Sequence, residues 1–207
     1  MHKPPLSTLK RAPSHRTLLI DAMRSLALAK GLPATSVEEV CERAGVTKGS
    51  FYHHFSSKED LGVAALQAYY DDVATALRGG EWAAVADPHD RLGAFVAHAV
   101  EVCSGPLMAN GCLLGNFSLD IAESSPEIRR LISTMFLDLR EVVAGLIAEA
   151  AAQQGIEVDA RDLGDQFLAV LEGSNVLAKA HADRAARRRG IQFFGEHLAL
   201  LLDPKRA

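Results

Sequence analysis

A run of hydrogen-bond donors occupies the segment Thr47–Ser50 near the N-terminal end of the chain. The ammonium group of Lys48 can donate to the O6 and N7 acceptors of guanine in the major groove of DNA. The hydroxyl groups of Thr47 and Ser50 can donate to a phosphate oxygen or to a base edge. Gly49 lets the backbone approach a ligand closely, because it has no side chain. These residue types suit contacts with double-stranded DNA.

Two short helices joined by a tight turn would position these donors. Thr35–Ser36 can cap the first helix, and the glutamates at 38–39 supply the partner of a capping box. Apolar residues of this helix recur at helical spacing, namely Val37, Val40, Cys41 and Ala44. Gly45 stands where a helix ends in a left-handed residue, and Thr47 can cap a second helix that runs to Phe55. This order predicts a helix-turn-helix, whose second helix enters the major groove.

The second helix has two faces. Phe51 and Phe55 are four residues apart and are expected to pack into the head together with Leu61. Lys48, Gly49, Ser50 and His53 face elsewhere, near the helix N-terminus that reaches base edges. The adjacent His53 and His54 diverge by about 100° on a helix, so we expect no metal there. Lys48-Gly49-Ser50 lacks the glycine spacing and the strand of a phosphate-binding loop, and no cofactor is expected.

Three stretches at fixed spacing, ATSVEEVCERAGV, TKGSFYHHF and SSKEDL, resemble the N-terminal domain of TetR-family transcriptional regulators. The segment GCLLGNFSLDIAESSPEIRRLI is similar to one broad branch of that family. The resemblance implies that Tyr52 and His54 contact the sugar–phosphate backbone of DNA. Thr35 and Ser36, which cap the first helix of the motif, and Lys58, which opens the next long helix, match further family positions of this kind. Tyr52 could alternatively cover the core. The expected DNA contacts are Thr35, Ser36, Thr47, Lys48, Gly49, Ser50, Tyr52, His53, His54 and Lys58.

Composition favours packed helices. The chain has 207 residues, of which 48% are hydrophobic and 6% aromatic, and the apolar residues are mostly Ala and Leu. No apolar run approaches the roughly 20 residues that span a bilayer. Three cysteines without metal-ligand spacing, and without a secretory signal, indicate a reducing, cytoplasmic location. The net charge of −4 divides into +3 for residues 1–61 and −7 for the remainder, which suits a phosphate-binding head on an acidic body.

We predict an all-α fold, a nine-helix two-domain bundle. Residues 1–13 form a basic, Pro-rich arm that is expected to be disordered, 14–61 the DNA-binding domain, and 62–207 the effector-binding and dimerisation domain. Caps and helix breakers place the helices at 14–30, 36–44, 48–55, 56–80, 87–104, 111–125, 125–155, 159–182 and 184–202.

The resemblance further implies an effector site enclosed by the fifth to eighth helices. Polar, cysteine or aromatic residues on these mostly apolar helices are the candidates, and each could instead serve the core or an interface. They are His98, Cys103, Cys112, Asn116, Phe117, Phe136, Arg140, Glu172 and Asn175.

Cys112 allows two interpretations. It stands at the start of a predicted helix, where the helix N-terminus lowers the pKa of a thiol and favours a reactive thiolate. A sensor of electrophiles or oxidants would use such a thiol. The alternative is a small packing residue beside the tight turn at Gly111.

The expected function is a ligand-responsive repressor that leaves a palindromic DNA operator when a small apolar effector binds. The alternatives are a thiol-based sensor that uses Cys112 and a DNA binder without an effector. No zinc-protease motif, nucleotide-binding glycine loop or nucleophile elbow occurs, so we expect no enzyme. We expect a homodimer and no membrane contact. The residues expected to supply the apolar groups of the dimer interface come from the last two helices: Leu168, Leu171, Leu177, Phe193, Phe194, His197, Leu198 and Leu201.

Overall fold

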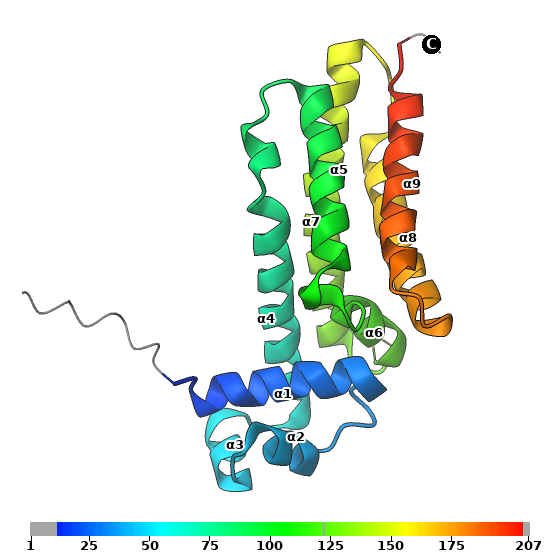
Figure 1. The fold of residues 1–207 in the computed structure, drawn as a ribbon. Helices are drawn as coiled ribbons and strands as arrows, with labels where there is room; N and C mark the ends of the chain where they lie inside the picture. The colour runs from blue at the N-terminus through cyan, green and yellow to red at the C-terminus, as the bar shows by residue number, and fades with distance from the viewer. Residues whose placement is uncertain (1–11, 122, 205–207) are drawn as a thin grey trace, which may run out of the picture.

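A computed structural model describes residues 12–121 and 123–204, and within these ranges the chain forms nine α-helices and two 3₁₀ turns without a strand (Figure 1). The all-α prediction is confirmed. The predicted N-terminal arm lies almost wholly outside the described residues. The helices are α1 (His15–Lys30), α2 (Val37–Ala44), α3 (Lys48–His54), α4 (Lys58–Arg78), α5 (Pro88–Ser104), α6 (Leu113–Asp120), α7 (Pro126–Gln154), α8 (Ala160–Ala180) and α9 (Ala185–Leu201), with 3₁₀ turns η1 (Glu81–Ala84) and η2 (Pro106–Met108).

Side-chain caps explain where most helices begin. At seven helices the residue before the first turn accepts a hydrogen bond from the backbone N–H three residues on; these residues are Ser14, Ser36, Thr47, Ser57, Asp87, Ser125 and Asp159. Each such cap contributes about 0.5–2 kcal/mol. In α2 the partner of the capping box is Glu39. Gly45 and Gly155 end α2 and α7 with φ of +67° and +68°, in the left-handed region that glycine favours.

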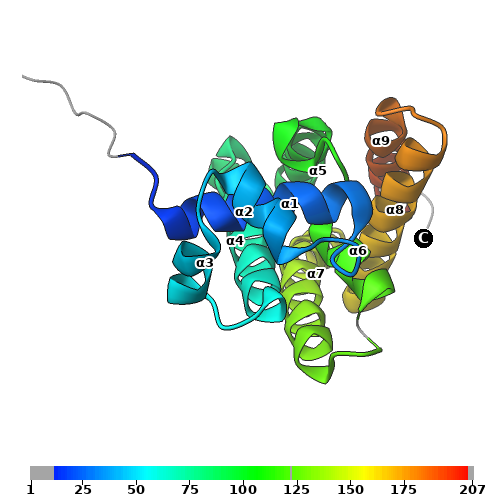
Figure 2. The same cartoon turned by 90° about the horizontal axis from the view of Figure 1, so that it is seen from below.

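Helices α1, α2 and α3 form a small head under the longer helices. α1 lies across the lower ends of these helices, and α2 and α3 lie beneath α1 (Figures 1 and 2). Phe51, Phe55 and Leu61 are buried together, with the two phenyl rings 6.1 Å apart. The predicted inner face of α3 is therefore confirmed.

The body consists of α4, α5, α7, α8 and α9, which run roughly side by side, with α6 beside the C-terminal end of α1 (Figure 1). A row of buried rings crosses it, since Phe167 lies 6.4 Å from Phe95 and 5.6 Å from Phe194. α9 approaches its neighbours closely at two glycines. A Cβ at Gly190 would overlap Oγ of Ser174 on α8, and one at Gly195 would press on Val96 of α5.

Two sequence expectations need correction. α6 is shorter than the predicted 111–125, because Gly111 adopts a φ of +104° before the helix and Ile121 ends it as the C-cap residue. Half of the apolar residues assigned to the dimer surface pack inside the subunit instead: Leu168, Leu171, Phe194 and Leu198. Apolar side chains that do reach the surface of the last two helices are Val176, Leu177, Phe193, Leu200 and Leu201.

Among the described helices, none alone is long and apolar enough to cross a membrane. The pair Pro88–Ser104 and Pro106–Asp120 satisfies the same criteria by length and composition, with a bend of 55° between its parts.

Candidate functional site

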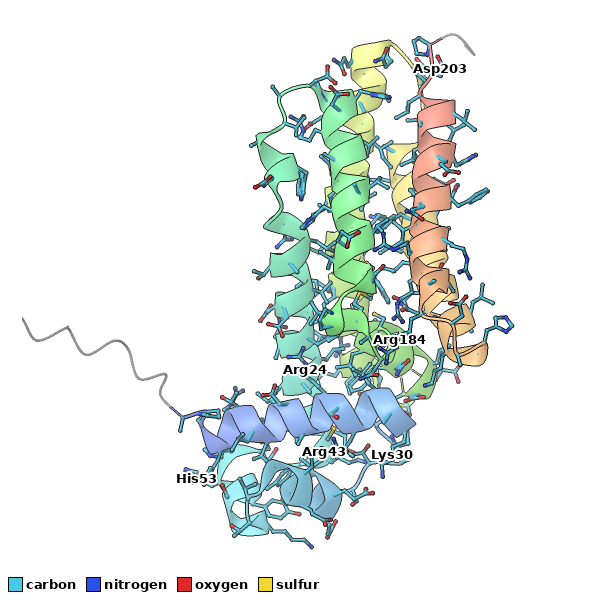
Figure 3. The ribbon with its side chains drawn as sticks, in the orientation of Figure 1. Arg24, Lys30, Arg43, His53, Arg184 and Asp203 are labelled. Atoms are coloured by element: carbon cyan, nitrogen blue, oxygen red, sulfur yellow. The ribbon has the colours of Figure 1, made fainter. Side chains whose placement is uncertain are left out.

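The outer surface of α3 is open. Lys48, Gly49, Tyr52 and His53 are exposed, and a Cβ added at Gly49 would meet only Oγ1 of Thr47, at 3.7 Å. Tyr52 has 60% of its surface exposed, although its ring also meets the buried Phe51 edge-on. Figure 3 shows His53 on α3 and Lys30 at the opposite side of the head. The exposed set gives α3 a polar surface that a DNA groove can reach.

Two of the predicted donors on α3 already have partners. Oγ1 of Thr47 accepts a hydrogen bond from the Ser50 N–H at 3.2 Å, which caps the helix. Oγ of Ser50 lies 2.9 Å from Nδ1 of His15 at the start of α1. Sequence reasoning missed His15, because the two residues are 35 positions apart and only the fold brings them together. His15 thus holds Ser50 beside the exposed surface of α3.

An ion pair joins Lys48 to Glu38 at the start of α2. The hydrogen bond between them lowers the pKa of Glu38 and raises the pKa of Lys48, so both groups stay charged. Glu38 was expected only as a capping residue, and its place beside Lys48 was missed. This carboxylate would compete with any other acceptor for the Lys48 ammonium group.

We expect Glu38→Gln to strengthen DNA binding about two- to fivefold, because exposed ion pairs are weak but their loss frees Lys48 and removes a negative charge. Gel-shift titrations of both proteins at two salt concentrations would measure this. Glu42→Gln, the same change at an exposed residue of α2, is the control. Weaker binding by Glu38→Gln would show that Glu38 positions Lys48 for contact.

Three predicted DNA contacts outside α3 have different surroundings. Thr35 is 1% exposed and its hydroxyl donates to the Gly31 carbonyl at 2.8 Å, so this prediction is corrected: Thr35 braces the loop after α1. Ser36 is partly buried and bonded to Glu39. The Lys58 ammonium group donates to the carbonyl oxygens of Leu32 and Pro33, at 3.1 and 3.3 Å. Lys58 thereby ties the start of α4 to the head.

The body encloses a small apolar cavity of about 30 Å³ between α4, α5, α6, α7 and α8. Four of the predicted effector residues line it: Cys103, Cys112, Phe136 and Glu172. A groove of about 800 Å³ opens next to it between α6 and α8, and Asn116, Phe136, Glu172 and Asn175 line this groove. Phe136 and Glu172 border both spaces, so they separate the closed cavity from the open groove.

Three predicted effector residues lie outside both spaces. Nε2 of His98 donates to the Ala76 carbonyl at 2.7 Å and thereby joins α5 to α4. Phe117 is fully buried in the core. Arg140 forms surface ion pairs with Glu141 and Asp165, at 2.8 and 3.5 Å. All three serve packing between helices, so their assignment to the pocket is corrected.

The Cys112 thiol is not activated. Burial raises its pKa well above the usual value, and the neighbouring Glu172 carboxyl raises it further. The helix N-terminus was expected to lower this pKa, but loss of water around the thiolate outweighs that effect. Burial likewise raises the pKa of Cys103 to about 12, and it raises the pKa of Cys41. All three thiols are buried and protonated.

In the part of the chain that the structure describes, no three His, Cys, Asp or Glu side chains gather closely enough to hold a metal ion.

An exposed recognition helix on a three-helix head, joined to an all-helical body with an internal cavity, defines the class of helix-turn-helix transcriptional regulators. Comparison with known families agrees. The profile described as "Bacterial regulatory proteins, tetR family" matches residues 19–65, and "Tetracyclin repressor-like, C-terminal domain" matches residues 88–194. The chain belongs to the TetR family and is a DNA-binding transcriptional regulator.

Individual relatives cover most of the chain. The HTH-type transcriptional repressor DhaR of Mycobacterium sp. (strain GP1) is 30% identical over 154 residues, 74% of each chain. The transcriptional regulator AcuR of Cereibacter sphaeroides is 27% identical over 186 residues, 89% of this chain and 84% of its own. A crystal structure of the regulatory protein TetR from Rhodobacter sphaeroides is 28% identical, with a TM-score of 0.76 over 87% of this chain and 96% of its own.

Proposed function

We propose that this protein is a dimeric transcriptional repressor that a small, largely apolar effector releases from a palindromic operator. Residues 14–61 would bind DNA, and 62–207 would bind the effector and form the dimer. One observation carries the proposal. The second half of α4, from Tyr69 to Arg78, lines the apolar cavity, and the same helix begins at Lys58 on the head. A continuous helix thus connects the cavity to the DNA-binding surface.

The proposed DNA contacts are those predicted residues that remain at or near the surface. Base contacts come from the start of α3, with Lys48 as the main reader of sequence, and backbone contacts fix the register of the protein on DNA. The set is Ser36, Thr47, Lys48, Gly49, Ser50, Tyr52, His53, His54 and Lys58.

Lys48→Ala is expected to weaken binding to the selected operator about ten- to a hundredfold and to relax preference at one base pair, since Lys48 reads a guanine edge. The operator is first obtained by selection from a random DNA library with the purified protein. Gel-shift titrations then compare the variants. Lys179→Ala, the same charge change on α8, is the control. Equal affinities of Lys48→Ala and wild type would remove Lys48 from the interface.

The proposed dimer uses the outer faces of α8 and α9. Five apolar side chains are exposed there: Val176, Leu177, Phe193, Leu200 and Leu201. Phe193 has 69% of its surface exposed, which is an unfavourable state for a phenyl ring that no partner covers. A two-fold dimer would place the α3 helices about 34–36 Å apart, to meet successive turns of the major groove.

The cavity must enlarge to hold an effector. Its volume of about 30 Å³ leaves room for little more than a water molecule. An effector therefore stabilises a form of the body with its helices further apart, and it releases DNA only if it binds this form more tightly. Coupling of about 1–3 kcal/mol is typical of such systems. A thermal-shift screen of apolar compounds, followed by operator titration, tests the proposal. Operator binding unchanged by every stabilising compound would favour control by a protein partner.

The thiol-sensing alternative gives a separate expectation. A maleimide should label none of the three cysteines of the native protein within minutes, and all three after denaturation, because each thiol is buried and protonated. Mass spectrometry counts the adducts. Rapid labelling of native Cys112, with loss of operator binding that Cys112→Ser prevents, would restore the thiol mechanism.

A further inference from the structure

Two polar side chains of α8, Glu172 and Asn175, line the groove between α8 and α6. Glu172 and Asn175 are three residues apart on the helix, so they lie on one face. The Glu172 carboxyl group occupies the space left by Gly115 on α6, where an added Cβ would overlap Oε2. Asn175 is 93% buried, since 7% of its surface is exposed. Gly115 therefore provides room for a carboxyl group between the two helices.

Three polar atoms of this pair have no hydrogen-bond partner. They are Oε1 of Glu172 and both Oδ1 and Nδ2 of Asn175, all shielded from solvent. Leaving a buried polar group unpaired costs about 1–3 kcal/mol, and more for a charged group. Burial also raises the pKa of Glu172. The neighbouring Cys112 and Asn175 side chains lower that pKa in part, but none of the three atoms makes a hydrogen bond of good geometry.

The groove beside these atoms has the shape and lining of a ligand site. It measures about 800 Å³, and Leu119, Phe136 and Val176 give it apolar walls. Two of the described cations line it: Lys30, which is paired with Glu39, and the exposed Lys179, one helical turn after Asn175. No basic side chain within the described ranges hydrogen-bonds to Glu172. Among the described residues, therefore, no cation acts on the Glu172 carboxyl group.

The three unpaired polar atoms indicate which chemical group a ligand would need in order to bind them. Two of the three are oxygens that accept hydrogen bonds, and this holds for either orientation of the Asn175 amide. A primary ammonium group carries three N–H donors, and its hydrogen bonds to a carboxylate are about twice as strong as neutral ones. A carboxylate ligand would instead face the Glu172 carboxyl.

We propose that the groove binds an amphipathic primary amine, with an aryl or alkyl body against Phe136 and Leu119. A small separation of α6 and α8 would open the shielded polar atoms to the ammonium group, which would then lie between Glu172 and Asn175. This inference rests on the proposed function, in which the body holds the effector, and it names the chemical class of that effector. Phe136 and Glu172 also border the closed cavity, so the same ligand would reach the space that α4 lines.

Three size-matched probes test the class on the full chain without DNA: 2-phenylethylamine, 2-phenylethanol and 3-phenylpropionate. Isothermal titration calorimetry measures the affinity and stoichiometry of each. We expect one amine per subunit, bound at least tenfold more tightly than the alcohol or the acid. Equal binding of the amine and the alcohol, or tighter binding of the acid, would overturn the proposal.

Two variants assign the binding to these residues. Glu172→Gln should lower the affinity for the amine about ten- to a hundredfold, the range for losing a hydrogen bond to a charged group, and should abolish selectivity over the alcohol. Glu127→Gln, the same change at an exposed carboxylate of α7, should bind as wild type does. Asn175→Leu should weaken amine binding while raising the thermal midpoint of the free protein, because it removes unpaired buried atoms. A purely structural asparagine would lower that midpoint.

The remaining outcomes separate this inference from the proposed function. If Glu172→Gln and Asn175→Leu change the dimer dissociation constant but not amine affinity, a second copy of the chain supplies the hydrogen-bond partners of these polar atoms. The inference then fails. If an apolar compound without an amine releases the operator and the amine does not bind, the proposed function stands and the inference fails. If the amine binds selectively but leaves operator affinity unchanged, the site stands and the repressor mechanism fails.

Discussion

Phe193→Glu is expected to yield a folded monomer whose operator affinity is lower by a factor of about 10²–10⁴, the range lost when two linked binding sites are separated. The Phe193 side chain points outward from α9 and makes no contribution to the buried core. A glutamate there would be solvated in the monomer, but two symmetry-related copies would place charge in the apolar interface of the dimer. Light scattering measures the mass and gel shifts measure the affinity.

The adjacent residue provides the control. Phe194 is 3% exposed and lies 5.6 Å from the Phe167 ring, so Phe194→Glu should bury an unpaired charge and unfold the body. Circular dichroism would then show that Phe193→Glu keeps its helices and Phe194→Glu does not. A Phe193→Glu protein that remains a dimer at micromolar concentration would exclude α9 from the interface.

Phe51→Ala should destabilise the head by about 3–5 kcal/mol, because it removes a fully buried ring from a small core. The head has only three short helices, so a loss of this size should unfold it at a temperature where the body remains helical. Differential scanning calorimetry would resolve an early transition, and operator binding should disappear at 37 °C.

Tyr52→Ala is the matched change on the other face of α3. Its ring is mostly exposed and meets Phe51 edge-on, 5.0 Å between centroids. We expect an almost unchanged melting temperature and a several-fold loss of DNA affinity, since the proposed contact with the DNA backbone is removed. If both variants lose stability equally, the two faces of α3 would not have the separate roles described above.

The local signals in the sequence were sufficient for most of the fold. Ser36, Thr47 and Asp159 cap their helices as predicted, and Gly45 and Gly155 end helices in the left-handed conformation. These features depend on residues within four positions of each other, which a sequence displays directly. The C-terminal end of α6 is an exception, because the C-cap residue Ile121 is neither a glycine nor a proline.

The environment of individual side chains was less predictable. Neighbouring helix positions differ by about 100° in direction, so whether Phe193 or Phe194 faces the core depends on how α9 is rotated against α8. Thr35 could have been an exposed cap or a buried residue of the loop after α1, and only its burial in the folded head decides this. Cys112 likewise depends on Glu172, 60 positions away in the sequence. Such contacts are set by tertiary packing, which composition and periodicity do not reveal.

The burial of all three thiols allows a single introduced cysteine to be labelled selectively. Because Cys41, Cys103 and Cys112 are buried, a cysteine introduced at the exposed Glu42 of α2 would be the uniquely reactive site of each subunit. A nitroxide attached there would give one spin per head and one spin–spin distance per dimer. Pulsed electron resonance could then record the separation of the two heads in the free, operator-bound and ligand-bound protein, without altering any native cysteine.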